Sequence, residues 1–464
     1  MTVRSLEAER VTPYLGFLFL LLSTATLFDG FDAAMIGFAA PDVRASLGID
    51  LKDWGLISGI TRMGVMASFV FLFFADRIGR RAMMMLTVIG FTVANGATAL
   101  ANDPVQFTAL QLVARLFLTA EYSLAIIMIG EEFPARLRGR SIAILTSLAT
   151  VGVMAMAKIQ PYILLPEGAE GNWLHDLGHA LVSFAQTSFG LPVDGAGWRS
   201  LYALGLLPLV LVLVLRLAMR ETRRFEAERV RAATAPKRTW RDLAREAGMP
   251  WWRKYRRRSA IVALLWNSVF IVTGPSTVFY VIFAREQLKL STYQVGDIIF
   301  WGYGGGVAGH FVAGWLIDRI GRKYTCAGFY IFAAVAIFLL YHVPSVAGQY
   351  AFMVMTVFSF AAANTATYVY ASELFPTEIR ATGFGWTTNL AGRVTEVLTP
   401  MAIGLLIAPL GIPGAIAVVA AGPVLGALLV LRYAPETRGL TLEQIAHQLD
   451  DSLPGGRTAE RAGS

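Results

Sequence analysis

A charged motif that occurs twice at a constant separation constrains the fold of this 464-residue chain most strongly. The residues Asp-Arg-Ile-Gly-Arg occupy 76–80 and return at 318–322, 242 residues later. The residues Glu-x-Phe-Pro occupy 131–134 and return at 373–376 with the same separation. Each copy lies between long apolar runs. Charged clusters that keep one register over this distance indicate a duplicated bundle of helices.

Composition places the predicted bundle in a membrane. Hydrophobic residues make up 55% of the chain and charged residues only 16%, whereas soluble domains carry about 25% charged residues. A helix needs about 20 apolar residues to cross about 30 Å of hydrocarbon. We expect twelve such spans, at roughly 13–38, 54–74, 82–101, 105–130, 141–161, 198–219, 259–283, 292–316, 324–342, 348–371, 381–407 and 412–433. The expected fold is all-α and polytopic, with twelve transmembrane helices in two pseudo-symmetric six-helix bundles.

The repeat also predicts the domain boundaries. We expect an N-terminal six-helix bundle at 1–220, a cytoplasmic linker at 221–258, a C-terminal six-helix bundle at 259–435 and a cytoplasmic tail at 436–464. The loops after spans 2, 4, 6 and 8 are rich in Lys and Arg, and the opposite loops carry few. The positive-inside rule therefore predicts a multi-pass protein of the cell (inner or plasma) membrane with both termini in the cytoplasm.

An insertion between spans 5 and 6 makes the first half longer than the second. Within it, Trp173, Leu177 and Phe184 fit one face of a helix, so we expect a short amphipathic helix. His175 and His179 are spaced like a pair of metal ligands, but no third ligand accompanies them. We therefore expect no metal site.

The duplicated loop, Asp-Arg-x-Gly-Arg followed by Arg or Lys, resembles the signature loop of the major facilitator superfamily. The glycine usually found four residues before the Asp is present as Gly314 and is replaced by Leu72 in the first copy. The Pro-Glu-Thr-Arg-Gly segment at 435–439 is similar to the tail signature of sugar porters. The resemblance covers about 13–445 and implies a secondary transporter whose two halves rock around a central site, giving alternating access.

The acids and bases of the duplicated loops are candidates for a latch that closes the cytoplasmic face. Exposed ion pairs contribute only about 0–1 kcal/mol each, but a network can bias a conformational equilibrium of a few kcal/mol. The alternative is that these charges only set the topology. The candidate gate residues are Asp76, Arg80, Glu131, Arg138 and Glu221 in the first half and Asp318, Arg322, Glu373, Arg380 and Glu436 in the second.

Charges inside apolar spans cost about 2.5–3.5 kcal/mol each at mid-helix and so indicate function. Asp29 and Asp32 share one face of span 1, and Arg115 and Glu121 lie in span 4. The Asp-Gly-Phe-Asp segment at 29–32 resembles the motif of aromatic-acid:proton symporters, and its last three residues are similar to the Gly-Tyr-Asp of proton-coupled sugar porters. The resemblance implies that Asp32 takes the proton and that Arg115 is its partner. Asp29 is the competing site, and a static buried ion pair is the alternative.

The proton candidates have no counterparts in the second half, where Gly274 and Val357 occupy the positions equivalent to Asp32 and Arg115. We therefore expect the second half mainly to bind substrate and to move. Arg393 or Lys158 is the expected anchor of a substrate carboxylate. The substrate-binding candidates are Lys158, Asn267, Tyr280, Tyr368, Trp386, Asn389, Arg393 and Glu396.

The expected function is proton-coupled symport of a small organic metabolite, which the resemblance suggests is a carboxylate or aromatic acid. Glu121-Tyr122 is similar to the Gly-Gly-Glu segment of organic-acid carriers, although Thr119 and Ala120 replace the two glycines. The alternatives are a sugar or polyol porter, a drug or metabolite efflux antiporter, and a nutrient sensor that no longer transports. We do not expect this protein to be an enzyme, since no loop pairs a nucleophile with a base. We also expect no cofactor beyond the proton gradient, no nucleic acid, and a monomer in the lipid bilayer.

Overall fold

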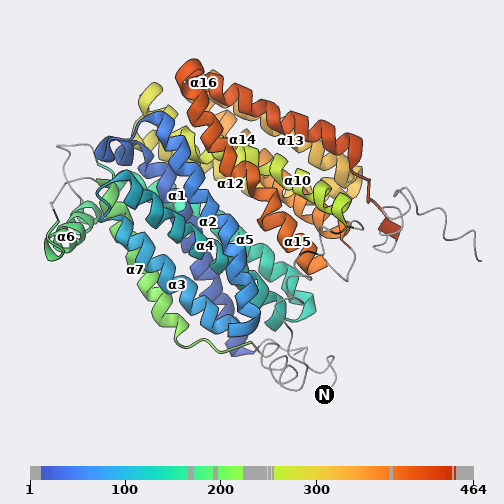
Figure 1. Cartoon of the computed structure of the whole chain (residues 1–464), viewed down its shortest axis with the longest axis horizontal. Coiled ribbons are helices and arrows are strands. Elements are labelled where there is room, and N and C mark those ends of the chain that lie inside the picture. The colour runs from blue at the N-terminus through green and yellow to red at the C-terminus, as the bar shows by residue number, and fades with distance from the viewer. Residues whose placement is uncertain are drawn as a thin grey trace, which may run out of the picture. The chain divides into compact units, whose positions relative to one another are not determined.

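The computed structural model describes residues 12–165, 172–191, 197–222, 248, 252, 255–375, 380–440 and 444–445, and the regular elements among them are all helices (Figure 1). The first half forms α1 (Pro13–Leu47), α2 (Leu51–Ile78), α3 (Arg80–Thr98), α4 (Pro104–Glu132), α5 (Ala135–Ile159), η2 (Gln160–Tyr162), α6 (Trp173–Ser188) and α7 (Gly197–Arg216). The second half forms α10 (Arg256–Gly274), η4 (Pro275–Phe279), α11 (Tyr280–Ile282), η5 (Phe283–Gln287), α12 (Thr292–Ile320), α13 (Arg322–His342), α14 (Val346–Leu374), α15 (Arg380–Asn389), η6 (Ala391–Arg393) and α16 (Val394–Tyr433).

Every predicted span coincides with helical structure. Span 7 consists of α10 and the segments up to η5, and two π-helical turns, η4 and η5, interrupt it. Spans 11 and 12 meet inside α16, where Gly411 has non-helical angles (φ 68°, ψ 175°). Seven helical segments in the described part of the chain are long and apolar enough to cross a membrane. Most of the predicted linker lies outside the described residues.

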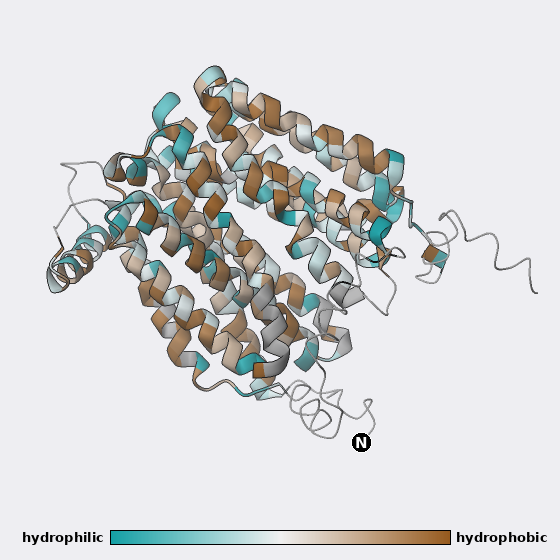
Figure 2. Ribbon diagram, in the orientation of Figure 1, coloured by the Kyte–Doolittle hydropathy of each residue, from teal (hydrophilic) through white to brown (hydrophobic). Residues whose placement is uncertain are grey.

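The surface of the helices suits a lipid environment. Hydrophobic residues run along the helices (Figure 2), and large apolar side chains such as Leu20, Val93 and Leu405 are 65%, 65% and 78% exposed. Exposed apolar surface on this scale marks contact with a membrane or a partner rather than with water. The predicted amphipathic helix is confirmed as α6, in which Trp173 and Phe184 are exposed.

Local chemistry fixes where the helices begin and end. Thr12 caps α1 by accepting a hydrogen bond from the backbone N–H of Leu15, and Asp103 caps α4, whose first residue is a proline. Gly48 ends α1 in the left-handed conformation (φ 63°), which favours glycine. The turn at Gly48 and the turn at Gly79, between α2 and α3, mark opposite ends of the first bundle, here called the Gly48 end and the Gly79 end.

Glycines bring α1 and α5 into direct backbone contact. A Cβ atom on Gly30 would lie 1.9 Å from the carbonyl oxygen of Ala149, and one on Gly152 would lie 1.9 Å from that of Leu27. Each helix therefore contributes a glycine to the crossing. Small residues at such crossings permit the close packing that stabilises helix pairs in membranes.

Backbone contacts divide the chain into two compact units. The first comprises Met1–Lys237 and Thr277–Tyr303, and the second comprises Arg238–Ser276 and Gly304–Ser464. The segment 277–303 thus packs with the first half, although it belongs by sequence to the second. The domain boundaries expected from the repeat stay a prediction.

Candidate functional site

Two acids of α1 are buried in the first unit. The residues Asp29 and Asp32 are 5% and 7% exposed. Among the described residues, neither carboxylate oxygen of Asp32 has a hydrogen-bond partner, and the same is true of Asp29 Oδ2. A buried polar group without a partner is costly, and an ionised one is costlier still. The ionised Asp32 carboxylate is therefore poorly stabilised at this position, and protonation would remove its buried charge.

Helices α3, α4 and α7 contribute the surroundings of Asp32. Arg115 of α4 lies within electrostatic reach of the Asp32 carboxylate and donates a hydrogen bond from Nη2 to the carbonyl oxygen of Ala33 (2.8 Å). A Cβ atom on Gly205 of α7 would lie 3.3 Å from Asp32 Oδ1 and 3.6 Å from Asn95 Nδ2 of α3. The structure thus brings Asp32, the residue expected to take the proton, within electrostatic reach of Arg115, its expected partner.

Glu121 forms a buried ion pair that the sequence analysis missed. Arg216 of α7 donates from Nη2 to Glu121 Oε1 (2.5 Å) and from Nη1 to the carbonyl oxygen of Met84 (3.1 Å). The two side chains are 0% and 2% exposed. Asp29 is within electrostatic reach of both. A charged residue inside an apolar span was the available signal, since Arg216 lies in predicted span 6.

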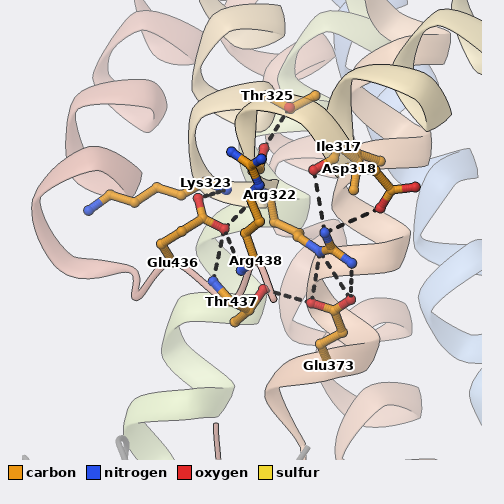
Figure 3. A network of polar contacts seen from close by, with 10 residues as sticks. Ile317, Asp318, Arg322, Lys323, Thr325, Glu373, Glu436, Thr437 and Arg438 are labelled. Carbon is orange, nitrogen blue, oxygen red and sulfur yellow. Dashed lines mark hydrogen bonds and ion pairs between the residues drawn. The ribbon is translucent and has the colours of Figure 1, made fainter. Parts of the chain in front are cut away.

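The duplicated loops form one polar network in each unit. In the second unit (Figure 3), Arg322 donates to Glu373 from Nε (3.1 Å) and Nη2 (2.9 Å), and its backbone N–H donates to Glu436 (2.9 Å). Thr437 completes the network with a hydrogen bond to Glu373 (2.6 Å). Planar, charge-assisted pairs of this kind are among the stronger hydrogen bonds in proteins.

The first unit repeats the contacts of Arg322, Glu373, Glu436 and Thr437 with the equivalent residues. Arg80 donates from Nη2 to Glu131 (2.8 Å), and its backbone N–H donates to Glu221 (2.9 Å). Thr222 supplies the hydroxyl that bonds Glu131 (2.9 Å). Each network ties together helix ends of its own unit, so the expected latch between the halves stays a prediction.

A glycine is required inside each network. Gly79 and Gly321 have φ angles of 110° and 98°, which L side chains rarely adopt. A Cβ atom on Gly321 would also lie 2.5 Å from Glu436 Oε2. The glycine of the loop motif therefore leaves room for the carboxylate that binds the next two backbone N–H groups.

Not every gate candidate can be placed. The side chains of Asp76, Arg138 and Arg380 lie outside the described residues. The carboxylate of Asp318 is 78% exposed and meets Arg322 at 3.4 Å. Asp318 is thus a peripheral member of the network in the second unit.

Several substrate candidates of the second unit gather around an aromatic cluster. The Trp266 ring stacks on Phe270 (5.4 Å between centroids) and meets Tyr368 edge-on (4.9 Å). Arg393 lies over the Phe270 ring (4.6 Å) and pairs with Glu396 (2.6 Å). Trp386 and Asn389, on α15, are partly buried.

Asn267 joins α10 to the start of α16. Its amide donates to the carbonyl oxygen of Ala391 and accepts from the backbone N–H of Thr395, both at 2.8 Å. Both bonds are to backbone groups, which indicates a structural role for this side chain.

Two substrate candidates lie in the first unit instead. Lys158, at the Gly48 end of α5, forms an ion pair with Asp297 and lies over the Phe300 ring (4.6 Å). Tyr280 is fully buried in the segment that packs against α1. Lys158 and Arg393 each form an ion pair with a carboxylate of the protein, so the positive charge of each expected anchor is already partly neutralised.

Comparison with known proteins decides the family. Residues 22–395 match the family model described as Major Facilitator Superfamily. This chain belongs to that superfamily. Major facilitators are built from two six-helix halves related as parallel repeats, so the predicted twelve-helix fold is confirmed, as is a multi-pass membrane location.

Individual relatives extend the comparison. The putative niacin/nicotinamide transporter NiaP of Bacillus subtilis is 26% identical, over 82% of this chain and 86% of the relative. The 4-hydroxybenzoate transporter PcaK of Pseudomonas aeruginosa is 27% identical, over 85% and 86%. The solved structure of the xylose transporter XylE from E. coli aligns with a TM-score of 0.71 at 17% identity, over 93% of this chain and 98% of XylE. The relatives and the solved structure named here are all transporters.

Proposed function

We propose that this major facilitator carries a small organic acid across the membrane together with a proton. The observation that carries the proposal is the state of Asp32, which is buried in a membrane helix with both carboxylate oxygens unbonded. An ionised carboxylate in such a place costs several kcal/mol, and protonation removes that cost. Arg115, on a different helix, provides the opposing charge that favours the ionised form.

Alternating access couples this equilibrium to transport. If rocking of the bundles changes the solvent exposure of Asp32 or its distance to Arg115, the two orientations differ in proton affinity. A change of about 1.4 kcal/mol in that balance shifts the protonation equilibrium tenfold. A transporter built in this way accumulates its cargo against a gradient only when a proton accompanies it.

The chemistry of the cargo is proposed from the relatives. Two relatives are named as transporters of niacin or nicotinamide and of 4-hydroxybenzoate, and niacin and 4-hydroxybenzoate are aromatic monocarboxylates. The likeness to the xylose transporter, at 17% identity, concerns the fold alone. We therefore favour a small aromatic or otherwise compact carboxylic acid over a sugar.

The remaining features of the proposed cycle follow from the sequence. We propose a monomer in the inner or plasma membrane with both termini in the cytoplasm, driven by the proton gradient without a bound cofactor. The loop networks around Glu131 and Glu373 would stiffen the cytoplasmic ends of the two bundles, and their disruption would alter how that face closes.

Uptake into proteoliposomes tests the function. The purified protein is given a panel of radiolabelled aromatic acids, aliphatic acids and sugars, with and without an inward pH gradient. We expect accumulation of at least one acid only with the gradient. Uptake that is indifferent to the gradient would contradict proton coupling, and uptake of sugars alone would contradict the cargo class.

Asp32→Asn tests the proton site, and Asp53→Asn, which alters an exposed acid at the start of α2, is the matched control. We expect Asp32→Asn to keep exchange of labelled for unlabelled cargo but to lose accumulation, because an amide cannot release a proton. Asp29→Asn shows whether the neighbouring acid carries the proton instead. Accumulation that survives in Asp32→Asn would refute the assignment.

A further inference from the structure

A pocket in the first unit is lined by residues that the sequence analysis did not connect. About 250 Å³ of space, part of it open to solvent, lies between α1, α2, α4 and the start of the segment 277–303. The lining residues are Ile36, Gly37, Trp54, Ser58, Thr61, Arg62, Arg115 and Val278. Only about 10 Å³ of this space admits the centre of a water-sized sphere, so in this conformation it has room for one small polar group rather than for a whole ligand.

The polar lining is made of hydrogen-bond donors. Arg62 and Arg115 present guanidinium groups, and none of the described lining residues is acidic. The indole N–H of Trp54 and the hydroxyl of Ser58 have no hydrogen-bond partner in the described part of the chain, although these residues are 0% and 2% exposed. Two cations and two unused buried donors around one space form a set that an anion would satisfy.

We propose that this pocket is the subsite for the carboxylate of the transported acid, held between Arg62 and Arg115. The proposal rests on the proposed function and deepens it, because it places the acid group of the cargo in the first unit rather than at Lys158 or Arg393. Planar guanidinium groups bind carboxylates through paired, parallel hydrogen bonds. The apolar lining of Ile36 and Val278 suits the hydrocarbon next to the acid group.

The buried charges of the first unit suggest how cargo and proton are coupled. The acids Asp29, Asp32 and Glu121 and the arginine Arg216 are buried, and Arg62 and Arg115 are partly buried. Together these six residues carry three negative and three positive groups. When all six are ionised, their charges sum to zero. A bound carboxylate adds one negative charge, and one proton on one of the three acids restores the balance.

Arg115 is the residue that links the two events, since it lines the pocket and also lies within electrostatic reach of Asp32. A carboxylate bound in the pocket partly neutralises the positive charge of Arg115. Ionised Asp32 is then stabilised less by that charge and binds a proton more readily. The other groups within electrostatic reach of Asp32 are Asp29 of α1, Glu121 of α4 and Tyr202 of α7, and Asn95 of α3 lies near the same point on Gly205. By linkage, protonation of Asp32 strengthens carboxylate binding by the same factor.

This coupling predicts the stoichiometry. One monocarboxylate and one proton together carry no net charge, so their symport moves no charge across the membrane. Uptake should respond to a pH gradient and not to a potential set with potassium and valinomycin. Uptake driven by the potential alone would overturn the one-to-one balance.

Binding to pairs of acids and amides tests the subsite directly. Nicotinate and nicotinamide, or benzoate and benzamide, have nearly the same shape but differ in charge. We expect the purified protein to bind at least one acid about tenfold or more tightly than its amide, a difference of about 1.4 kcal/mol. Equal affinity within both pairs, or no binding of either acid, would overturn the subsite.

Arg62→Gln provides the decisive variant, because Arg62 lines the pocket, whereas Arg115 is also the proposed partner of Asp32. It should weaken binding of the acid about 10–100-fold and leave binding of the amide unchanged, which also shows that the protein is folded. Arg62→Lys should restore part of the preference. Lys52→Gln, which removes an exposed positive charge from the same helix, should behave as the unaltered protein.

The two proposals fail in different ways. Gradient-driven acid uptake that keeps its affinity in Arg62→Gln would overturn the carboxylate subsite and leave the proposed function intact. If the unaltered protein takes up no acid at all, the proposed function fails and the subsite fails with it.

Discussion

The buried pair of Glu121 and Arg216 allows us to predict how much the free energy of unfolding falls when either side chain is replaced. The pair is 2.5 Å long, its side chains are 2% and 0% exposed, and Arg216 also bonds the carbonyl oxygen of Met84. Removing one partner of a buried ion pair leaves an uncompensated charge, which costs about 3–5 kcal/mol. We expect Glu121→Gln and Arg216→Gln each to lower the free energy of unfolding by about this amount.

The double variant should cost much less than the sum of the single variants. Removing both charges leaves neutral amides that can hydrogen-bond each other, so we expect a loss of about 1–2 kcal/mol, in line with the modest net value of buried pairs. The measurement is equilibrium unfolding in mixed micelles, followed by tryptophan fluorescence, for a complete double-mutant cycle. Additive losses would refute the reasoning, because they would mean that the two side chains do not interact.

The pair of Asp42 and Arg285 supplies a matched control in the same unit. It is nearly as short (2.6 Å), but its side chains are 31% and 24% exposed. Water therefore screens it, and the coupling energy should fall to about 1 kcal/mol or less. A control coupling as large as that of Glu121 and Arg216 would show that burial is not the deciding term.

Three further predictions concern packing and ion pairs elsewhere in the molecule. Gly30→Ala should prevent close packing of α1 on α5 and abolish a monodisperse peak in size-exclusion chromatography, whereas Gly16→Ala, with nothing within 4 Å of its Cβ position, should not. Arg322→Lys should keep the charge but lose the bidentate contact with Glu373, so we expect transport rates to fall several-fold with a small change in thermal stability. Arg44→Glu and Glu286→Arg should each reduce uptake and together restore it, because the pair is re-formed with reversed charges; a double variant no better than the singles would contradict this.

Long-range regularity made most of the fold predictable from the sequence. Apolar runs of about 20 residues and a charged motif repeated in register specify helices, their number and their duplication. The contacts of Arg80 with Glu131 and of Arg322 with Glu373 follow the same logic, since both pairs are 51 residues apart. In the structure each copy of the network is satisfied within its own unit.

Contacts that do not follow the repeat escaped prediction. Arg216 pairs with Glu121 across 95 residues, and neither residue belongs to the duplicated motif. The pocket that joins Arg62 to Arg115 depends on how α2 and α4 pack, and helix rotation is not encoded in an apolar run. The two π-helical turns of span 7 likewise have no sequence signal, because each adds one residue to a turn of otherwise ordinary helix.

The packing of the segment 277–303 with the first half has a consequence for dissecting the protein. This segment supplies the counter-charges of Asp42, Arg44 and Lys158 at the Gly48 end. A fragment that stopped within the linker would contain all of the first six spans and yet leave these three side chains without their partners. The two gene halves should therefore complement each other only when both are produced in the same cell, and a lone N-terminal fragment should be degraded.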